Sequence, residues 1–164
     1  MFELKRLAKD DVPRALERAE RYRLLNEPRE AESICLDVLE VEPAHQRTLV
    51  VLILALTDRF PGDLGPFDEA LALLPRLDSE YDRAYYRGIV YERRAKAMYA
   101  RGGPGCGRIA HEWLTKAMAA YENAQELSAD HMHAVLRWNT CARTIMRHPD
   151  IQPEPEDTFQ PFLE

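Results

Sequence analysis

Residues 12–43 read VPRALERAERYRLLNEPREAESICLDVLEVEP and contain two helical patterns separated by a short turn. The first pattern has Pro13 in its first turn, where the missing backbone N–H costs no hydrogen bond. Asp10 or Asp11 precedes it and can cap the helix, because an aspartate side chain accepts hydrogen bonds from the free N–H groups of the first turn. We therefore expect a helix that continues to about Leu25.

A second helix is expected after one turn. Residues 26–28, Asn-Glu-Pro, favour a turn, and Pro28 opens the next helix. Four small or apolar side chains then recur three or four residues apart, which places them on one helix face: Ala31, Cys35, Val38 and Leu39. Pro43 ends the pattern, so this stretch predicts an antiparallel pair of helices.

Helical patterns and helix breakers continue to alternate as far as residue 148. The expected helices cover residues 45–59, 67–74, 80–101, 108–127 and 130–147. Proline and glycine separate them, above all in the loop 60–66 and in the glycine-rich turn 102–107. No sustained period-two alternation bounded by turns is present, so strands are not expected. The sequence therefore predicts an all-α protein.

Small and aromatic residues recur at matching places in these helix pairs. In the first helices, Ala19 and Tyr22 of the first pair correspond to Gly88 and Tyr91 of the third. In the second helices, the corresponding small residues are Ala31, Ala70 and Ala117. A small residue lets two helices approach closely while an aromatic ring fills the gap beside it. The middle pair carries larger aliphatic residues at the first-helix positions.

This pattern resembles the tetratricopeptide-repeat (TPR) family over about residues 12–148. The units begin near Val12, Gln46 and Tyr81, so their starts are 34 and 35 residues apart, against a family period of about 34 residues. No unit has the family's first-helix Trp, and only the third has its Gly. The resemblance implies an α-solenoid of about three antiparallel helix pairs, with a C-terminal helix that caps the exposed face of the last pair.

The third pair is longer than the first. From Gly88 to Ala117 the chain advances 29 residues, whereas the matching interval from Ala19 to Ala31 is 12 residues. The difference of 17 residues is close to two extra turns on each of two antiparallel helices. We therefore expect a projecting hairpin with the glycine turn at its tip.

Charge is spread unevenly along the chain. The net charge is −6, but residues 83–116 contain eight Lys/Arg against two Glu. The basic hairpin that we expect here presents four arginines: Arg87, Arg94, Arg101 and Arg108. Such a surface is either simply solvated or holds an acidic peptide. Nucleic acid is the weaker choice of partner, because the protein as a whole is acidic and repels phosphate.

Residues 1–148 are expected to form the helical repeat domain, and residues 149–164 an acidic, Pro-rich tail. The tail has five carboxylates and no Lys or Arg. It is either a disordered acidic end or an extended segment that packs Phe159 and Phe162 on the solenoid of its own or a neighbouring molecule. The tail, or the groove described next, could therefore join two copies of the chain.

The resemblance to the TPR family also implies a binding groove. In that family the first helices line a concave surface, which takes an extended peptide or a helix of a partner protein. Carried over by motif position, the groove residues here are Leu16, Glu20, Arg23, Arg47, Val50, Leu54, Asp58, Tyr85, Ile89, Arg93, Lys96, Val135, Asn139 and Arg143. Mixed apolar and charged side chains are usual for an interaction surface. The positions that match the family's clamp for a C-terminal carboxylate hold Leu16 and Glu20, so that clamp is not expected.

We find no catalytic motif in the sequence. His131 and His133 lie two residues apart and cannot share a helix face, so they do not form a metal site with Cys141. Cys106 lies in a loose glycine turn, which would hold a nucleophile poorly against His111. The same turn lacks the preceding strand and the Lys-Ser/Thr of a phosphate-binding loop.

The sequence thus predicts a non-catalytic protein–protein interaction module, a scaffold or adaptor, with no metal or cofactor. The alternative is a helical-bundle enzyme or ligand-binding domain whose site assembles from distant residues such as His111, Glu112, His131 and His133. The three cysteines are widely spaced and predict no disulfide framework. The longest apolar run, residues 49–56, is too short for a membrane helix, and the first residues are charged, so a cytoplasmic protein is expected.

Overall fold

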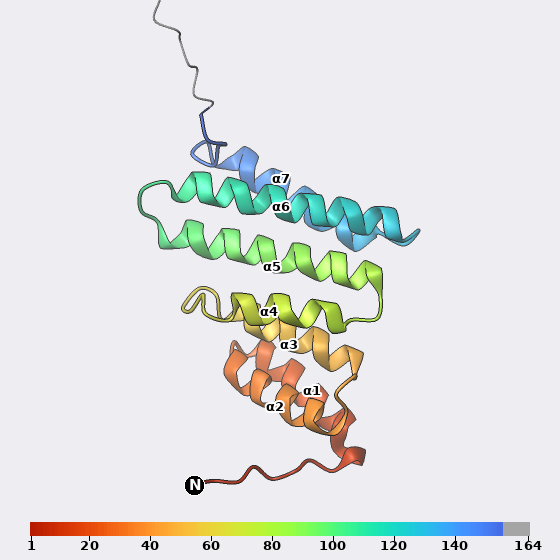
Figure 1. Ribbon diagram of the computed structural model, residues 1–164. Coiled ribbons are helices and arrows are strands. Elements are labelled where there is room, and N and C mark those ends of the chain that lie inside the picture. The colour runs from red at the N-terminus through yellow and green to blue at the C-terminus, as the bar shows by residue number, and fades with distance from the viewer. Residues whose placement is uncertain (156–164) are drawn as a thin grey trace, which may run out of the picture.

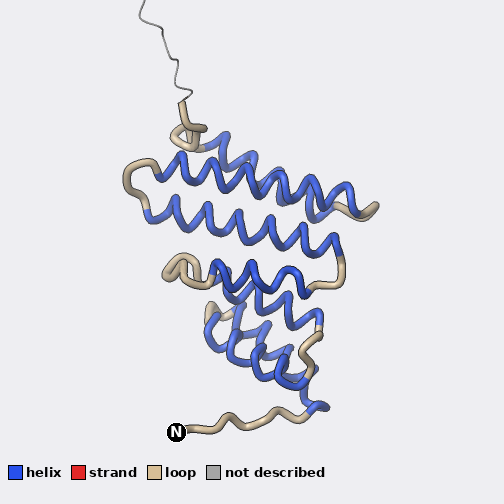
Figure 2. The backbone as a smooth tube through the Cα atoms, in the orientation of Figure 1, coloured by secondary structure: helices blue, strands red, loops and turns tan. Residues whose placement is uncertain are grey.

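Helices and the turns between them make up the computed structural model of the protein, which describes residues 1–155 (Figures 1 and 2). The seven α-helices are α1 (Val12–Leu24), α2 (Pro28–Val41), α3 (Gln46–Asp58), α4 (Phe67–Leu73), α5 (Glu80–Arg101), α6 (Cys106–Leu127) and α7 (Met132–Arg147). Short 3-10 helices precede α1 and follow α4. No strand occurs within these described residues, so the prediction of an all-α fold is confirmed.

The helices begin close to the residues that the sequence indicates. Pro13 lies in the first turn of α1, and Pro28 opens α2. Asp11 occupies the N-cap position of α1, but its carboxylate pairs with Arg14 and makes no capping hydrogen bond. α6 begins at Cys106, two residues earlier than expected, because the left-handed conformation of the preceding glycine turns the chain directly into the helix.

The helices stack in three antiparallel pairs, α1 with α2, α3 with α4 and α5 with α6, and α7 packs on α6 (Figure 1). The first helices of the pairs also pack together, α1 on α3 and α3 on α5, and so form one layer. The second helices connect each pair to the next, since α2 packs on α3 and α4 on α5. This arrangement is a solenoid with a terminal helix, as the sequence predicts.

The third pair is elongated, as predicted. α5 and α6 have 22 residues each, against 13 in α1 and 14 in α2. The turn between them contains three glycines with positive φ, Gly102, Gly103 and Gly105, a conformation that other residues rarely adopt. The layer formed by α1, α3 and α5 therefore includes one helix that is much longer than its neighbours.

The loop between α3 and α4 packs beside the long hairpin. Phe67, at the start of α4, is buried and meets Trp113 of α6 edge to face, with 5.3 Å between the ring centroids. Arg59 holds the loop by ion pairs to Glu32 of α2 at 2.6 Å and to Asp63 at 2.9 Å. The two flanks of the loop are thus held by contacts to α2 and α6.

The core depends on the small residues that the repeat pattern contains. Ala19, Ala31 and Ala117 are fully buried where paired helices cross. Gly88 lies directly against the ring of Tyr121, so close that a Cβ atom at position 88 would lie 2.4 Å from a ring carbon. Only glycine allows α5 and α6 to approach this closely at that point.

The chain after α7 returns to the tip of the long hairpin. Ile151 is buried, and the carbonyl of Asp150 lies against Gly107 of α6. Tyr99 of α5 donates a hydrogen bond to the Asp150 carboxylate at 3.1 Å. Residues after 155, including Phe159 and Phe162, lie outside the described part of the chain. The expected packing of these two side chains on the solenoid therefore concerns residues that the structure does not describe.

None of the helices within residues 1–155 combines the length and the apolar character that a bilayer crossing requires.

Candidate binding groove

A groove runs along α3, between α1 on one side and α5 on the other. It consists of three adjoining hollows of about 420–500 Å³ each. The hollow at the N-terminal end of α3 shares Glu20 and Arg47 with the middle hollow, and the middle hollow shares Arg23 with the one at the C-terminal end, so the three follow one another along the helix. We call this feature the α3 groove.

The structure brings most of the expected groove residues together. Nine of them line the α3 groove: Leu16, Glu20, Arg23, Arg47, Val50, Leu54, Asp58, Arg93 and Lys96. Two others belong to the core, because Ile89 is buried and Tyr85 is half-buried between Tyr81 and Tyr121. Val135, Asn139 and Arg143 lie on α7, outside the three hollows.

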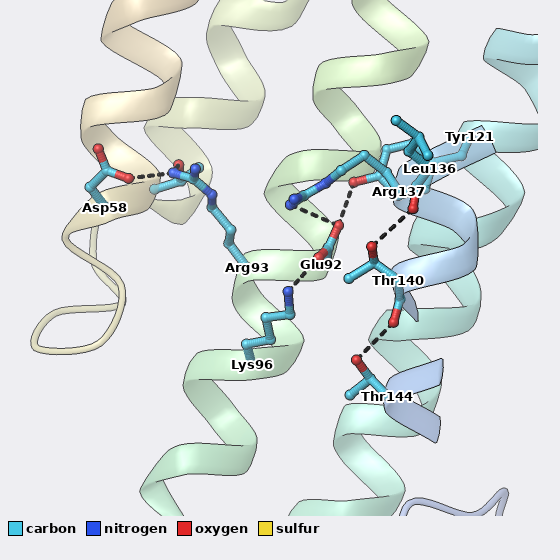
Figure 3. Close-up of polar contacts among 10 residues, drawn as sticks. Asp58, Glu92, Arg93, Lys96, Tyr121, Leu136, Arg137, Thr140 and Thr144 are labelled. Carbon is cyan, nitrogen blue, oxygen red and sulfur yellow. Dashed lines mark hydrogen bonds and ion pairs between the residues drawn. The ribbon is translucent and has the colours of Figure 1, made fainter. Parts of the chain in front are cut away.

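At one end of the groove a single carboxylate joins three helices. Asp58 of α3 accepts a hydrogen bond from Arg93 of α5 (Figure 3). It accepts another from Arg23 Nε of α1 at 2.7 Å. Arg93 also donates to Thr57 Oγ1 at 2.7 Å. These side chains are only 19–27% exposed, so their interactions are stronger than those of a surface ion pair. The contacts fix the spacing of α1, α3 and α5.

Arg93 carries its charge in an unfavourable environment. Burial lowers its pKa, and the positive charges of Arg23 and Arg137 lower it further, although Asp58 opposes them. The guanidinium remains charged, because arginine starts from a pKa of about 12 or more. An additional negative charge near Arg93 would therefore be favourable.

A second carboxylate joins α5, α6 and α7. Glu92 is fully buried in α5, accepts hydrogen bonds from Lys96 Nζ at 2.5 Å and Tyr121 OH at 2.7 Å, and forms an ion pair with Arg137 at 3.0 Å (Figure 3). Burial and the Glu92 charge raise the pKa of Tyr121 far above its ordinary value, so the phenol stays protonated and donates. A buried carboxylate is tolerated here because its oxygens are paired with cations and a hydroxyl.

Sequence reasoning missed Glu92 and Arg137. The spacing of Glu92 and Lys96, four residues apart on a helix, indicates a local ion pair but gives no sign that the carboxylate is buried. Arg137 lies 45 residues further along the chain, and only the packing of α7 brings it to Glu92. No local pattern in the sequence reports that contact.

The opposite end of the groove is rich in carboxylates. Glu20 of α1 accepts a forked ion pair from Arg47 of α3, with two distances of 2.8 Å. Glu17 and Asp82 also line this end. Burial raises the pKa of Asp82. His45 caps α3 by accepting the Thr48 N–H at its Nδ1 atom, which requires an unprotonated Nδ1.

The expected basic hairpin does not present its four arginines as one surface. Arg94 lies 4.0 Å above the ring of Phe67 and 4.8 Å from that of Trp113, half-buried between helices. Arg87 and Arg101 are exposed on α5. Arg108 pairs with Glu154 at 2.5 Å. The expected surface of four arginines is therefore interrupted at Arg94 by an internal cation–π contact.

The residues of the alternative enzyme site do not converge. His111 and Glu112 lie near the start of α6, whereas His131 and His133 lie beyond its far end. The 15 or more intervening helical residues separate the two groups by more than about 20 Å. Within residues 1–155, no group of three His, Cys, Asp or Glu residues is placed to hold a metal ion.

Comparison with known proteins adds no relative. No protein-family model matches the chain, and no match was found among curated proteins or solved structures. The TPR resemblance therefore depends on the residues quoted above, and function has to be argued from the α3 groove.

Proposed function

We propose that this protein is a non-catalytic protein–protein interaction module, a TPR-like scaffold or adaptor, that binds a segment of a partner protein in the α3 groove. The observation that carries the proposal is the groove itself, in which three helices contribute an apolar floor and charged edges. Val50, Leu54 and Tyr86 form part of that floor. Apolar area with polar groups around it is the usual composition of a protein-binding site.

The rigidity of the groove supports the same function. Asp58 connects α1, α3 and α5, and Glu20 connects α1 to α3 through Arg47. Helices held in this way need little rearrangement when a ligand enters, and preorganisation of that kind lowers the entropic cost of binding. An open groove of fixed width suits a peptide better than a small molecule, which is usually bound in an enclosed pocket.

Photo-cross-linking in the native host tests this proposal. A photoreactive amino acid replaces Val50 on the groove floor, and in a matched control it replaces Leu36, which is exposed on α2 outside the groove. We expect a specific cross-linked protein from position 50 and none from position 36. The adduct should disappear when Leu54→Lys places a charge on the floor.

The contradicting outcomes are equally specific. Equal cross-linking from both positions, or an adduct that survives Leu54→Lys in a variant with an unchanged circular dichroism spectrum, would place the partner elsewhere. No second function is favoured by an observation, because the residues of the alternative enzyme site lie far apart.

We also propose a cytoplasmic location. All three cysteines are free, and Cys35 and Cys141 are buried, as is usual for proteins of reducing compartments. Fractionation of cells that express the tagged full chain checks this, and recovery from an oxidising compartment would contradict it.

A further inference from the structure

The two ends of the α3 groove carry opposite charge. The basic end is lined by three cations and one carboxylate, Arg23, Arg93, Lys96 and Asp58, and the buried pair of Glu92 and Arg137 lies beside Lys96. The acidic end contains three carboxylates and one cation: Glu17, Glu20, Asp82 and Arg47.

The basic end keeps a surplus of two positive charges. Asp58 is shared between Arg23 and Arg93, and Glu92 is shared between Lys96 and Arg137. Each carboxylate therefore neutralises only one of its two cations. Lys96 is 45% exposed and lines the groove, so part of this charge faces a ligand.

The acidic end keeps a surplus of two negative charges. Arg47 is engaged by both oxygens of Glu20. Glu17 and Asp82 make no ion pair within 4.0 Å of a cation in residues 1–155. Glu17 is exposed and Asp82 is half-buried at the edge of the groove.

Helix dipoles reduce this difference but do not remove it. The basic end lies at the C-termini of α1 and α3, which contribute about −0.5 of a charge each. The acidic end lies toward the N-termini of α1 and α3, and Asp82 lies in the first turn of α5, so three N-termini contribute about +0.5 each there. Roughly one unit of positive charge remains at the basic end, and roughly half a unit of negative charge remains at the acidic end.

The length of α3 sets the distance between the two ends. Arg47 and Asp58 are 11 residues apart on the helix, which corresponds to about 16 Å along its axis. A peptide in extended conformation advances about 3.3 Å per residue, so it covers this distance in about five residues. A helical ligand would need about eleven residues.

We propose that the α3 groove selects an extended peptide that carries one acidic and one basic side chain about five residues apart. The acidic side chain lies over Lys96 and Arg93, and the basic side chain lies over Glu17, in the hollow that Glu17 shares with Glu20. This inference rests on the proposed function, because it names the chemistry of the segment that the groove binds. A purely acidic segment, such as residues 149–164 of a second copy, matches only the basic end.

Selection from a library tests the proposal. The full-length protein is immobilised and random 16-residue peptides displayed on phage are selected against it. We expect the selected peptides to share an acidic and a basic residue about five positions apart. Their binding should be lost in Val50→Lys, which blocks the groove floor.

Charge neutralisation at each end then tests the two contacts separately. Lys96→Gln should weaken a selected peptide about fivefold, and this loss should vanish when the acidic residue of the peptide is changed to its amide. Glu17→Gln should show the same dependence on the basic residue of the peptide. Lys116→Gln is the matched control, because Lys116 pairs with Glu112 four residues away on α6 just as Lys96 pairs with Glu92, and it lies outside the groove.

Failure of this inference differs from failure of the proposed function. Three outcomes would overturn the inference and leave the groove as a binding site. The selected peptides need Val50 but show no coupling to Lys96 and Glu17, they carry only acidic residues, or their acidic and basic residues lie eleven positions apart. If no selected peptide depends on Val50, both proposals are wrong. The melting temperatures of Lys96→Gln and Glu17→Gln should be unchanged. A loss of affinity in either variant then reports on the contact between that side chain and the peptide.

Discussion

Single residues in this protein have functions that their type alone does not reveal. Gly88 is a helix-interior glycine, and in isolation glycine weakens a helix by about 1 kcal/mol relative to alanine. Its value here lies in the contact with Tyr121, which is fully buried and surrounded by α5, α6 and α7. Glu92 is a charged residue with no exposed surface, held by two hydrogen bonds and an ion pair from side chains of three helices.

Gly88→Ala should destabilise the protein in spite of the better helix propensity of alanine. The added methyl group would lie 2.4–2.8 Å from three ring carbons of Tyr121. Overpacking of a core costs about 1–3 kcal/mol, so we expect the free energy of unfolding to fall by about 2 kcal/mol in urea denaturation. Gly62→Ala is the control, since the nearest atom to its Cβ is 4.0 Å away. Equal stability of the two variants would mean that the helices can move apart freely.

Glu92→Gln should lower the free energy of unfolding by about 3 kcal/mol, because it leaves Lys96 and Arg137 without their counter-charge in a buried site. Glu112→Gln removes the same kind of pair from the surface of α6, where Lys116 lies 2.6 Å away. Such an exposed pair contributes about 0–1 kcal/mol. Denaturation curves of the two variants measured side by side check the difference, and similar losses would show that Glu92 is not specially held.

At the scale of elements, the helices could be predicted because their signals are local. Proline and glycine mark the boundaries, and the three-to-four spacing marks the buried faces. The unequal length of the third pair followed from counting between matched small residues.

The role of Arg94 could not be predicted, because its partners Phe67 and Trp113 belong to other helices. A set of arginines on a helix looks the same in the sequence whether the side chains are solvated or packed. The same limit explains why Glu92 and Arg137 were missed in the candidate site, while most groove residues followed from their place in the repeat.

The segment after α7 stabilises the tip of the long hairpin, and Gly107 makes this possible. A Cβ at position 107 would lie 2.1 Å from the Asp150 carbonyl oxygen, so Gly107→Ala should displace residues 148–154 and expose Ile151. We expect faster amide hydrogen exchange at the hairpin tip, while exchange in α1 and α2 stays unchanged. Ile151→Ala should give the same local pattern, and unaltered exchange in both variants would contradict the role of the segment.

For the whole molecule, alkaline stability depends on groups that folding keeps protonated. Burial raises the pKa of Cys35, Cys141 and Tyr86 to about 12 each, against ordinary values of 9.0 for the thiols and 10.0 for the phenol. Between pH 9 and 12 the unfolded chain therefore releases protons that the folded chain retains. The number of bound protons is lower in the unfolded state, so the free energy of unfolding falls as pH rises through this window.

A thiol reagent checks the two cysteines directly. At pH 9 we expect Ellman's reagent to modify Cys106 in the folded protein and all three cysteines in urea, because the buried thiols stay protonated and covered. A Cys106→Ser variant should show no fast reaction before unfolding. Rapid modification of Cys35 or Cys141 in the native protein would mean that the core opens far more readily than its packing indicates.

The shared carboxylate of Asp58 also affects how the molecule responds to force. Repeat solenoids commonly stretch like springs, since each unit touches only its neighbours and small rotations add up along the stack. Here Arg23 and Arg93 converge on one anchor from helices on either side of it, and both contacts are largely shielded from water. Pulling the first and third pairs apart must break at least one of them before the stack can open. We therefore expect this protein to be stiff under small loads and to yield abruptly when its two ends are pulled apart in a single-molecule force experiment.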